Sequence, residues 1–236
     1  MNKIAIFVEG LTEQEFISGV LKSLVDERKL QIEIKSQFKG ALQLKILSTT
    51  CTSKPEWHVL IANCNNDEQV KTQIIENYNS LTTQGYQYII GIRDVFPHLH
   101  QALPKLRAGL KIGLPKGIIP IEVHLAVMEV EAWFIEEYTH FSRIDEKITD
   151  TEINSAGYDK TTMSAEDLRN PAEVLHAIYQ TVGKAYRKNN RQISRTISAL
   201  DFGEILNATR KRAPSLNNAI TSIEFALNLP NSPAAA

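Results

Sequence analysis

Residues 1–15 read MNKIAIFVEGLTEQE and contain the pattern that decides the fold. Residues 4–8 form a continuous apolar run with β-branched members, which is typical of a strand buried on both faces of a sheet. The run stops at Glu9, and a helix is predicted soon after it, with Thr12 as N-cap and Glu15 closing a capping box. The pattern therefore predicts a central strand, a tight turn and an amphipathic helix, with an acidic residue at the carboxyl end of the strand.

Composition indicates an ordinary globular protein. The 236 residues are 43% hydrophobic and 22% charged, and the net charge of −1 gives no sign of a polyanionic or membrane partner. The two cysteines form no CxxC pair, which argues against a zinc site or a disulfide framework and fits a reducing compartment. The amino terminus runs straight into the first strand and no apolar run reaches membrane-spanning length. We expect a cytoplasmic protein.

Strand and helix patterns alternate along the first part of the chain. A half-exposed edge strand is predicted at residues 31–35 and a helix at 38–50, and further apolar strands are predicted at residues 57–64, 86–92 and 118–128. This alternation predicts an α/β fold with a mainly parallel central sheet and helices on both faces. The strand signals fade after residue 137, so we expect an α/β core at 1–140 and a helical C-terminal extension at 141–236 packed on it.

Acidic residues follow several of the predicted strands, namely Glu9, Asp94, and Glu129 or Glu131. Parallel strands end at one edge of a sheet, so the fold itself would bring these carboxylates together. Clustered carboxylates repel one another unless a cation lies among them, and oxygen ligands of this kind suit Mg²⁺ or Mn²⁺. The alternatives are a solvated strand end for Glu9 and, for Glu131, a first-turn acid that complements a helix dipole.

Charge is segregated along the chain although the total is near zero. Residues 184–212 contain eight bases and two acids, whereas residues 122–167 contain twelve acids and three bases. This distribution suits a metal site beside a phosphate-binding surface, and the alternative is a set of solvated helix faces with internal ion pairs. Arg93 either clamps a phosphate or pairs with Asp94 or a neighbouring acid. The candidate nucleic-acid contacts are Arg93, Lys184, Arg187, Lys188 and Arg191.

Several common catalytic motifs are absent from the sequence. There is no GxxxxGK[ST] loop and no GxGxxG after the first strand, which argues against a P-loop ATPase and a dinucleotide-binding fold. There is also no HExxH and no GxSxG. The strand-end acids remain as the group that can do chemistry.

The first strand and turn, IAIFVEG followed by Thr12 and Glu13, resemble the first motif of the Toprim fold, and Asp94 after YQYIIGIR resembles its second motif. More closely, the chain resembles the bacterial Toprim-like family DUF4276. The similar features are the EGxTE start, Asp94, the Glu-Ala-Trp at residues 131–133, the NPAEVL at 170–175 and the APSL at 213–216.

The resemblance implies a Mg²⁺-dependent nuclease. It gives Glu9 the role of general acid or base, and a place among the metal ligands, and it gives Asp94 the metal role. The second acid of the Toprim DxD is missing, because Val95 and Phe96 follow Asp94. Three residues are therefore candidates for the missing ligand: Glu129, Glu131 and Asp67.

The resemblance also implies a partner. Toprim-like chains of this kind are often encoded beside ABC-type or overcoming-lysogenization-defect-type (OLD-type) ATPases in phage-defence loci, so we expect a defence effector that cuts DNA or RNA together with such an ATPase. The incomplete DxD favours an alternative, a catalytically silent Toprim-like subunit that regulates or is regulated by the ATPase. A small-molecule phosphotransferase on the same scaffold is a third interpretation.

Overall fold

In the computed structural model, residues 1–39, 41–48, 54–65 and 69–228 are described. The chain forms two compact units that interleave along the sequence. The first contains residues 1–93, 105–125 and those from 218 onward, and the second contains residues 94–104 and 126–217. The predicted domain boundary after residue 140 stays a prediction, because a division into compact units does not show which parts of the chain fold independently.

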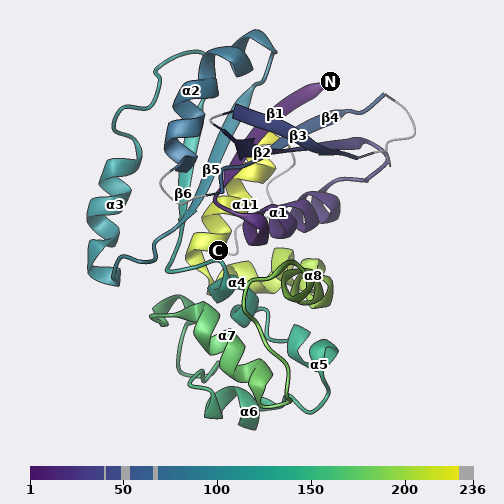
Figure 1. Ribbon diagram of the computed structural model, residues 1–236, viewed down its shortest axis with the longest axis vertical. Helices are drawn as coiled ribbons and strands as arrows, with labels where there is room; N and C mark the ends of the chain where they lie inside the picture. The colour runs from purple at the N-terminus through teal and green to yellow at the C-terminus, as the bar shows by residue number, and fades with distance from the viewer. Residues whose placement is uncertain (40, 49–53, 66–68, 229–236) are drawn as a thin grey trace. The chain divides into compact units, whose positions relative to one another are not determined.

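The first unit is built on a six-stranded sheet with the strand order β3-β2-β4-β1-β5-β6 (Figure 1). The β1–β4, β1–β5 and β2–β4 pairs are parallel, and only β2–β3 is antiparallel among the pairs whose register is described. The α/β class with a mainly parallel sheet is therefore confirmed. The strands are β1 (Asn2–Val8), β2 (Leu30–Phe38), β3 (Ala41–Leu47), β4 (Trp57–Asn63), β5 (Tyr88–Asp94) and β6 (Ile121–Ala126).

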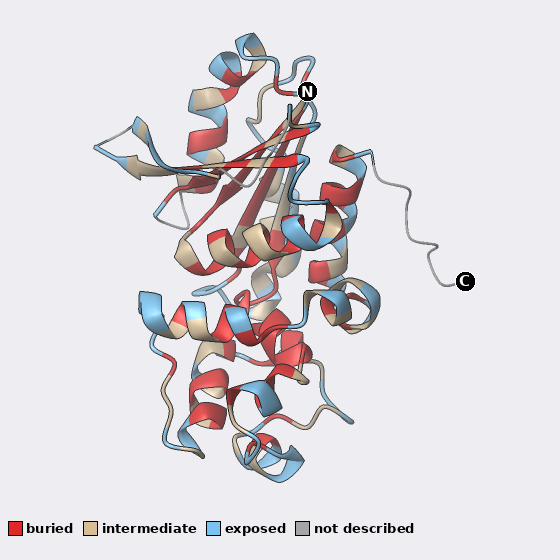
Figure 2. Ribbon diagram, turned by 90° about the vertical axis from the view of Figure 1, so that its right-hand side faces the viewer, coloured by how far each residue is buried: buried red, intermediate tan, exposed pale blue. Residues whose placement is uncertain are grey.

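Helices cover both faces of this sheet, and Figure 2 shows its inner strands as buried. Alternate residues of β1 point to opposite faces. On one face, Ala5 and Phe7 share a buried cluster with residues of α2 (Gln69–Thr83). On the other, the Asn63 side chain donates a 3.0 Å hydrogen bond to Gln14 of α1 (Leu11–Leu24). The Tyr88 ring on that second face contacts Phe225 of α11 (Pro214–Ala226) edge-on.

Three local predictions for this unit are wrong. The expected helix at residues 38–50 contains β3 instead, whose ALQLKIL sequence alternates with the period of a strand and pairs with β2. Consequently β2 lies between β3 and β4 and is not an edge strand. The first helix is capped two residues earlier than expected, because Glu13 accepts the backbone N–H of the N-cap residue Gly10 at 2.9 Å.

The second unit consists mainly of short helices. They are η1 (His100–Ala102), the first residues of α3 (Leu103–Leu110), α4 (Glu131–Glu136), α5 (His140–Ile144), α6 (Asp150–Ser155), η2 (Ala165–Asp167), α7 (Pro171–Gln180), α8 (Asn190–Ala199), α9 (Phe202–Glu204), a π-helical turn η3 (Ile205–Thr209), α10 (Arg210–Arg212) and the start of α11. C-terminal helices are thus confirmed.

The core of the second unit is organised around Trp133 of α4, which is fully buried. Its indole N–H donates to the Ser215 hydroxyl at 2.8 Å, and that hydroxyl donates to Glu166 at 2.6 Å. The chain Trp133–Ser215–Glu166 gives the buried polar atoms their partners, as buried polar groups require. Helix α4, which carries one of the candidate acids, is therefore held in place by its own core residue.

One candidate ligand, Asp67, lies outside the described residues. Among the helices of the described part of the chain, none is long and apolar enough to cross a membrane.

Candidate metal centre

The site begins with a tight turn at residues 127–130 that is joined to the end of β5. The backbone N–H groups of Val95 and Phe96 donate to the carbonyl of Met128 at 3.1 and 2.8 Å. Met128 has a φ of 61°, a left-handed conformation that costs a non-glycine residue about 1–3 kcal/mol. This turn sets Glu129 beside the residue that ends β5, Asp94. The Asp94 side chain completes the connection, because its Oδ1 accepts the backbone N–H of Val130 at 3.1 Å.

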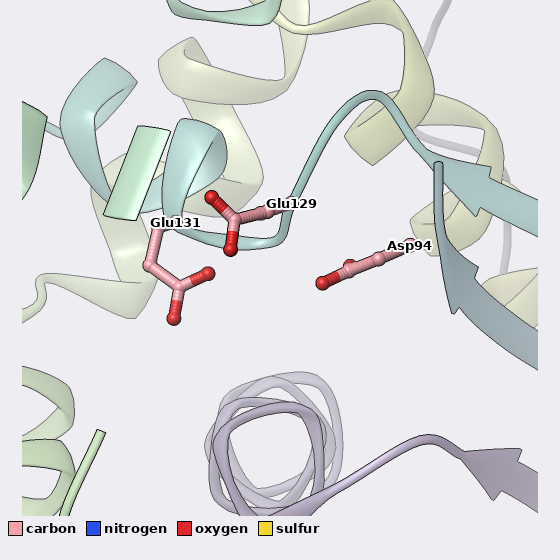
Figure 3. Close-up of side chains that lie close together, drawn as sticks. All are labelled: Asp94, Glu129 and Glu131. Atoms are coloured by element: carbon pink, nitrogen blue, oxygen red, sulfur yellow. The ribbon is translucent and has the colours of Figure 1, made fainter. Parts of the chain in front are cut away.

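Three carboxyl groups meet at this turn. Asp94 comes from the end of β5, Glu129 from the turn itself and Glu131 from the first position of α4 (Figure 3). One oxygen atom from each side chain lies within 4.8 Å of one from the other two. The exposed fractions are 6% for Asp94, 7% for Glu129 and 0% for Glu131, so the carboxylates have lost most of their solvation by water. We call Asp94, Glu129 and Glu131 the acidic trio.

Glu129 is held by two further contacts in the second unit. Its Oε2 accepts the backbone N–H of Ala172 at 3.0 Å. Ala172 is the second residue of α7, so the carboxylate lies at the positive end of that helix. Its Oε1 accepts a hydrogen bond from the ammonium group of Lys188 at 2.9 Å. These contacts fix both oxygen atoms of Glu129.

Glu131 is the most buried member of the trio. Burial raises its pKa, and the neighbouring charge of Glu129 acts in the same direction. Two groups oppose this rise: the Tyr186 hydroxyl donates to Oε1 at 2.7 Å, and the Lys188 ammonium lies 3.1 Å from Oε2. A fully buried carboxylate with a raised pKa is costly to keep charged unless a cation stays beside it.

Lys188 is the cation beside the trio. Its side chain is 40% exposed, and its backbone has a φ of 52°, again in the left-handed region. Burial alone would lower its pKa, but the charges of Glu131, Glu129 and Asp94 outweigh burial and raise the pKa above its ordinary value. The lysine therefore stays protonated and neutralises one of the three negative charges when the trio is fully ionised.

The donor set fits a hard divalent cation. Three ionised carboxylates and one ammonium leave a charge of −2, which such an ion would balance. The ligand atoms are all oxygen, as Mg²⁺, Mn²⁺ and Ca²⁺ prefer. The three ligand oxygen atoms lie within 4.8 Å of one another, so they form a group that could hold one such ion.

Glu9, the fourth predicted acid, belongs to the first unit. It follows β1 directly and is 6% exposed. Cys64, which follows β4, donates its backbone N–H to Val8 at 2.9 Å. Burial raises the pKa of the Cys64 thiol to about 12, and the charge of Glu9 adds to this rise. Glu9 is therefore a buried carboxylate near a neutral thiol at the carboxyl ends of β1 and β4.

The predicted nucleic-acid contacts are distributed differently from the expectation. Arg93 belongs to the first unit, and its buried Nε has no hydrogen-bond acceptor among the described residues. In the second unit, Lys184 pairs with Asp145 at 2.6 Å and Arg187 with Glu173 at 3.2 Å. The remaining two are Lys188, which contacts the acidic trio, and Arg191, which is exposed.

Several cations of the basic segment, residues 184–212, are thus already engaged in ion pairs. Besides Lys184, Arg187 and Lys188, Arg212 pairs with the buried Glu136 at 3.4 Å. The internal ion pairs considered as the alternative for residues 184–212 are present at these four positions.

Sequence reasoning missed the groups that orient the trio. These are the backbone N–H groups of Val130 and Ala172 and the hydroxyl of Tyr186. Their partners are 36, 43 and 55 residues away along the chain, so no local spacing indicates them. The only available signal was the position of Tyr186 and Lys188 in a basic segment.

Comparisons with protein-family models, with curated proteins and with solved structures found no match to this chain.

Proposed function

We propose that this chain holds one divalent cation, Mg²⁺ or Mn²⁺, on Asp94, Glu129 and Glu131 and hydrolyses phosphodiester bonds in DNA or RNA. One observation carries the proposal: three buried carboxylates from two separate segments offer one oxygen each within 4.8 Å, with a residual charge of −2 once Lys188 is counted. Burying this much like charge is unfavourable without a cation, so the arrangement favours an ion-binding role over a purely structural one.

The residues around the trio have separate roles in this proposal. A bound divalent ion would supply a Lewis acid that neutralises charge on a phosphodiester and lowers the pKa of water. Val130, Ala172 and Tyr186 keep the carboxylates aimed inward through their hydrogen bonds. Lys188 provides a positive charge for a phosphate oxygen once it is released from Glu129. Glu9, which belongs to the first unit, is proposed as the general acid or base on the Toprim resemblance alone.

The nuclease activity, the Toprim and DUF4276 relationship, the phage-defence role and the ABC-type or OLD-type ATPase partner rest on the sequence resemblance. The trio adds chemical support because it supplies the acids that the incomplete DxD lacks. In this proposal Asp94 is the strand-end acid, and Glu129 and Glu131 serve in place of the missing second acid.

A specific observation favours a second candidate, the catalytically silent subunit that works with a partner ATPase. Lys188 already contacts Glu129 and Glu131, so a protein cation stands where an inorganic one would be needed. In this alternative the ammonium permanently stabilises the buried acids, and the site binds no ion.

Cleavage of mixed single- and double-stranded DNA and RNA in Mg²⁺, Mn²⁺ or EDTA tests the proposal. We expect cleavage that requires the ion and is lost in Asp94→Asn and Glu9→Gln. Asp26→Asn, which removes an exposed carboxylate of the first unit, serves as the matched control and should cleave normally. Persistence of cleavage in Asp94→Asn would contradict the site, whereas failure of the wild type to bind Mn²⁺ or cleave would favour the silent subunit.

A further inference from the structure

A cavity of about 560 Å³ lies in the second unit at the start of α8. Its lining residues are Lys184, Asn189, Arg191, Gln192 and Arg195. Three of the five are cations and the other two carry amides. No acidic residue is among them, so the cavity is built to receive a negative group.

Two of these cations are not neutralised. Arg191 and Arg195 are four residues apart on α8 and so lie on one face of the helix. Among the described residues, no carboxylate is within ion-pair distance of either. Lys184 differs, because its ammonium group contacts Asp145 and the carbonyl of Ile144. The cavity therefore keeps the charge of two arginines.

Arg195 is held in a fixed position beside the cavity. Its guanidinium donates to the carbonyl of Ala185 and lies 5.2 Å from the centre of the Tyr179 ring. Its Nε atom is buried and has no hydrogen-bond partner within the described part of the chain. A buried donor of this kind is costly unless a ligand accepts from it.

The start of α8 adds backbone donors to the same place. The Asn189 side chain caps the helix by accepting the N–H of Gln192 at 3.0 Å. The N–H groups of Asn190 and Arg191 donate to no acceptor within the ranges that the structure describes. The amino end of α8, which carries the positive end of the helix dipole, supplies the lining residues Asn189, Arg191 and Gln192, and this favours an anion.

We propose that this cavity binds a phosphate group, and specifically a backbone phosphate of a single nucleic-acid strand. Paired guanidinium groups and free backbone N–H groups match the several oxygen atoms of a phosphate better than a single carboxylate oxygen. A nucleic-acid strand is favoured as the source of the phosphate because Asn189 directly follows Lys188, the residue that contacts the acidic trio. The phosphate class rests on the cavity alone, and the strand as its source rests on the proposed nuclease function.

Fluorescence anisotropy of a labelled oligothymidylate tests this site with the full chain in EDTA, so that no divalent ion takes part. We expect Arg191→Ala/Arg195→Ala to weaken binding at least tenfold, since each arginine supplies charge-assisted hydrogen bonds. The slope of log K against log salt should fall by about 0.7, because the two arginines contact one phosphate and each phosphate contact on a single strand contributes about 0.7. Arg28→Ala/Lys29→Ala removes the same charge from exposed positions and should leave the slope unchanged.

Two further measurements distinguish loss of the anion site from misfolding of the double variant and identify the source of the anion. The exposed Arg191 side chain makes no ion pair or hydrogen bond among the described residues, so Arg191→Ala alone should fold normally and still weaken binding of the strand. Inorganic phosphate, added as a competitor and titrated by calorimetry, separates the two sources of the anion. If the wild type binds phosphate but no strand, and the double variant loses phosphate binding, the cavity is an anion site but its ligand is not a nucleic-acid strand.

The anion site would be overturned if the wild type bound neither probe, or if Arg191→Ala/Arg195→Ala bound both as the wild type does. These outcomes do not depend on the metal centre, because ion binding there is measured separately by titration with Mn²⁺. Strand binding in EDTA without Mn²⁺ binding would contradict the proposed function alone. Mn²⁺ binding without phosphate or strand binding would contradict the cavity alone.

Discussion

Replacing Lys188 with methionine tests how the acidic trio is kept charged. The substitution keeps an unbranched side chain of similar length but removes the ammonium group that lies 2.9 Å from Glu129 and 3.1 Å from Glu131. Glu131 is fully buried, so it then loses its cation, and among the described residues the Tyr186 hydroxyl remains as a partner for one of its oxygen atoms. We expect the variant to be less stable than the wild type in EDTA at pH 7.

The magnitude follows from the exposure of the two partners. Removing one partner of a fully buried ion pair costs about 3–5 kcal/mol, whereas exposed pairs contribute about 0–1 kcal/mol. Lys188 is 40% exposed and Glu131 is not exposed, so this pair falls between the two cases. We estimate a loss of about 2 kcal/mol in the free energy of unfolding.

The loss in the free energy of unfolding should depend on pH in a characteristic way. The pKa of Glu131 in the folded protein is already above its ordinary value, so the folded state binds its proton more tightly than the unfolded state. The contribution of this group to stability is then fully present below its unfolded pKa and decreases as pH rises. Without Lys188 the folded pKa rises further, so the deficit of Lys188→Met should be small near pH 4.5 and largest near pH 7.

Urea denaturation followed by tryptophan fluorescence measures these differences, because Trp133 lies in the same unit as the trio. Mn²⁺ at about 100 times its Kd should stabilise the variant by about 2.7 kcal/mol, which more than offsets the loss. Lys29→Met removes a lysine whose ion pair with Glu56 is exposed, and it should behave as the wild type does. The reasoning would be refuted if Lys188→Met were as stable as Lys29→Met in EDTA at pH 7 and gained nothing from Mn²⁺.

Three further predictions concern the scaffold. Gly91→Ala should lower the free energy of unfolding by about 1–3 kcal/mol in urea denaturation, because the new Cβ would lie 2.9 Å from Ile74 and 3.2 Å from Val70; an unchanged midpoint would contradict the described packing. Ser215→Ala should cost about 2–3 kcal/mol by the same assay, since Trp133 and Glu166 both lose a buried hydrogen-bond partner. Burial lowers the pKa of His140 to about 4, so the stability it contributes should be present above pH 6.5 and lost as pH falls toward 4. The advantage of the wild type over His140→Gln should therefore shrink by about 2–3 kcal/mol between pH 7 and pH 4, and a constant difference would exclude a buried neutral histidine.

Sequence pattern predicted the parts of the fold that local chemistry determines. The apolar runs that form β1, β4 and β5 are recognisable because strands buried on both faces have no polar alternation. The strand β3 was mistaken for a helix, because its leucines are compatible with both and only the pairing with β2 decides between them. Gly10 as N-cap was missed because it has no side chain to signal the role.

The candidate site was predictable in its acids but not in its surroundings. Asp94, Glu129 and Glu131 could be named because strand ends and helix starts place polar groups at an edge of the sheet. The role of Lys188 could not, since its ammonium reaches the trio from 59 residues away and the basic segment looked like one continuous surface. The left-handed turn at Met128, which brings the two segments together, has no signal in a methionine.

The central claim is that Asp94, Glu129 and Glu131 bind a divalent cation, and calorimetric titration of the full chain with Mn²⁺ tests it most directly. We predict one bound ion per chain, an affinity at least tenfold weaker in Asp94→Asn and in Glu131→Gln, and no change in the exposed control Asp26→Asn. An affinity that is the same in Asp94→Asn and the wild type, or no binding by the wild type at millimolar Mn²⁺, would contradict the account.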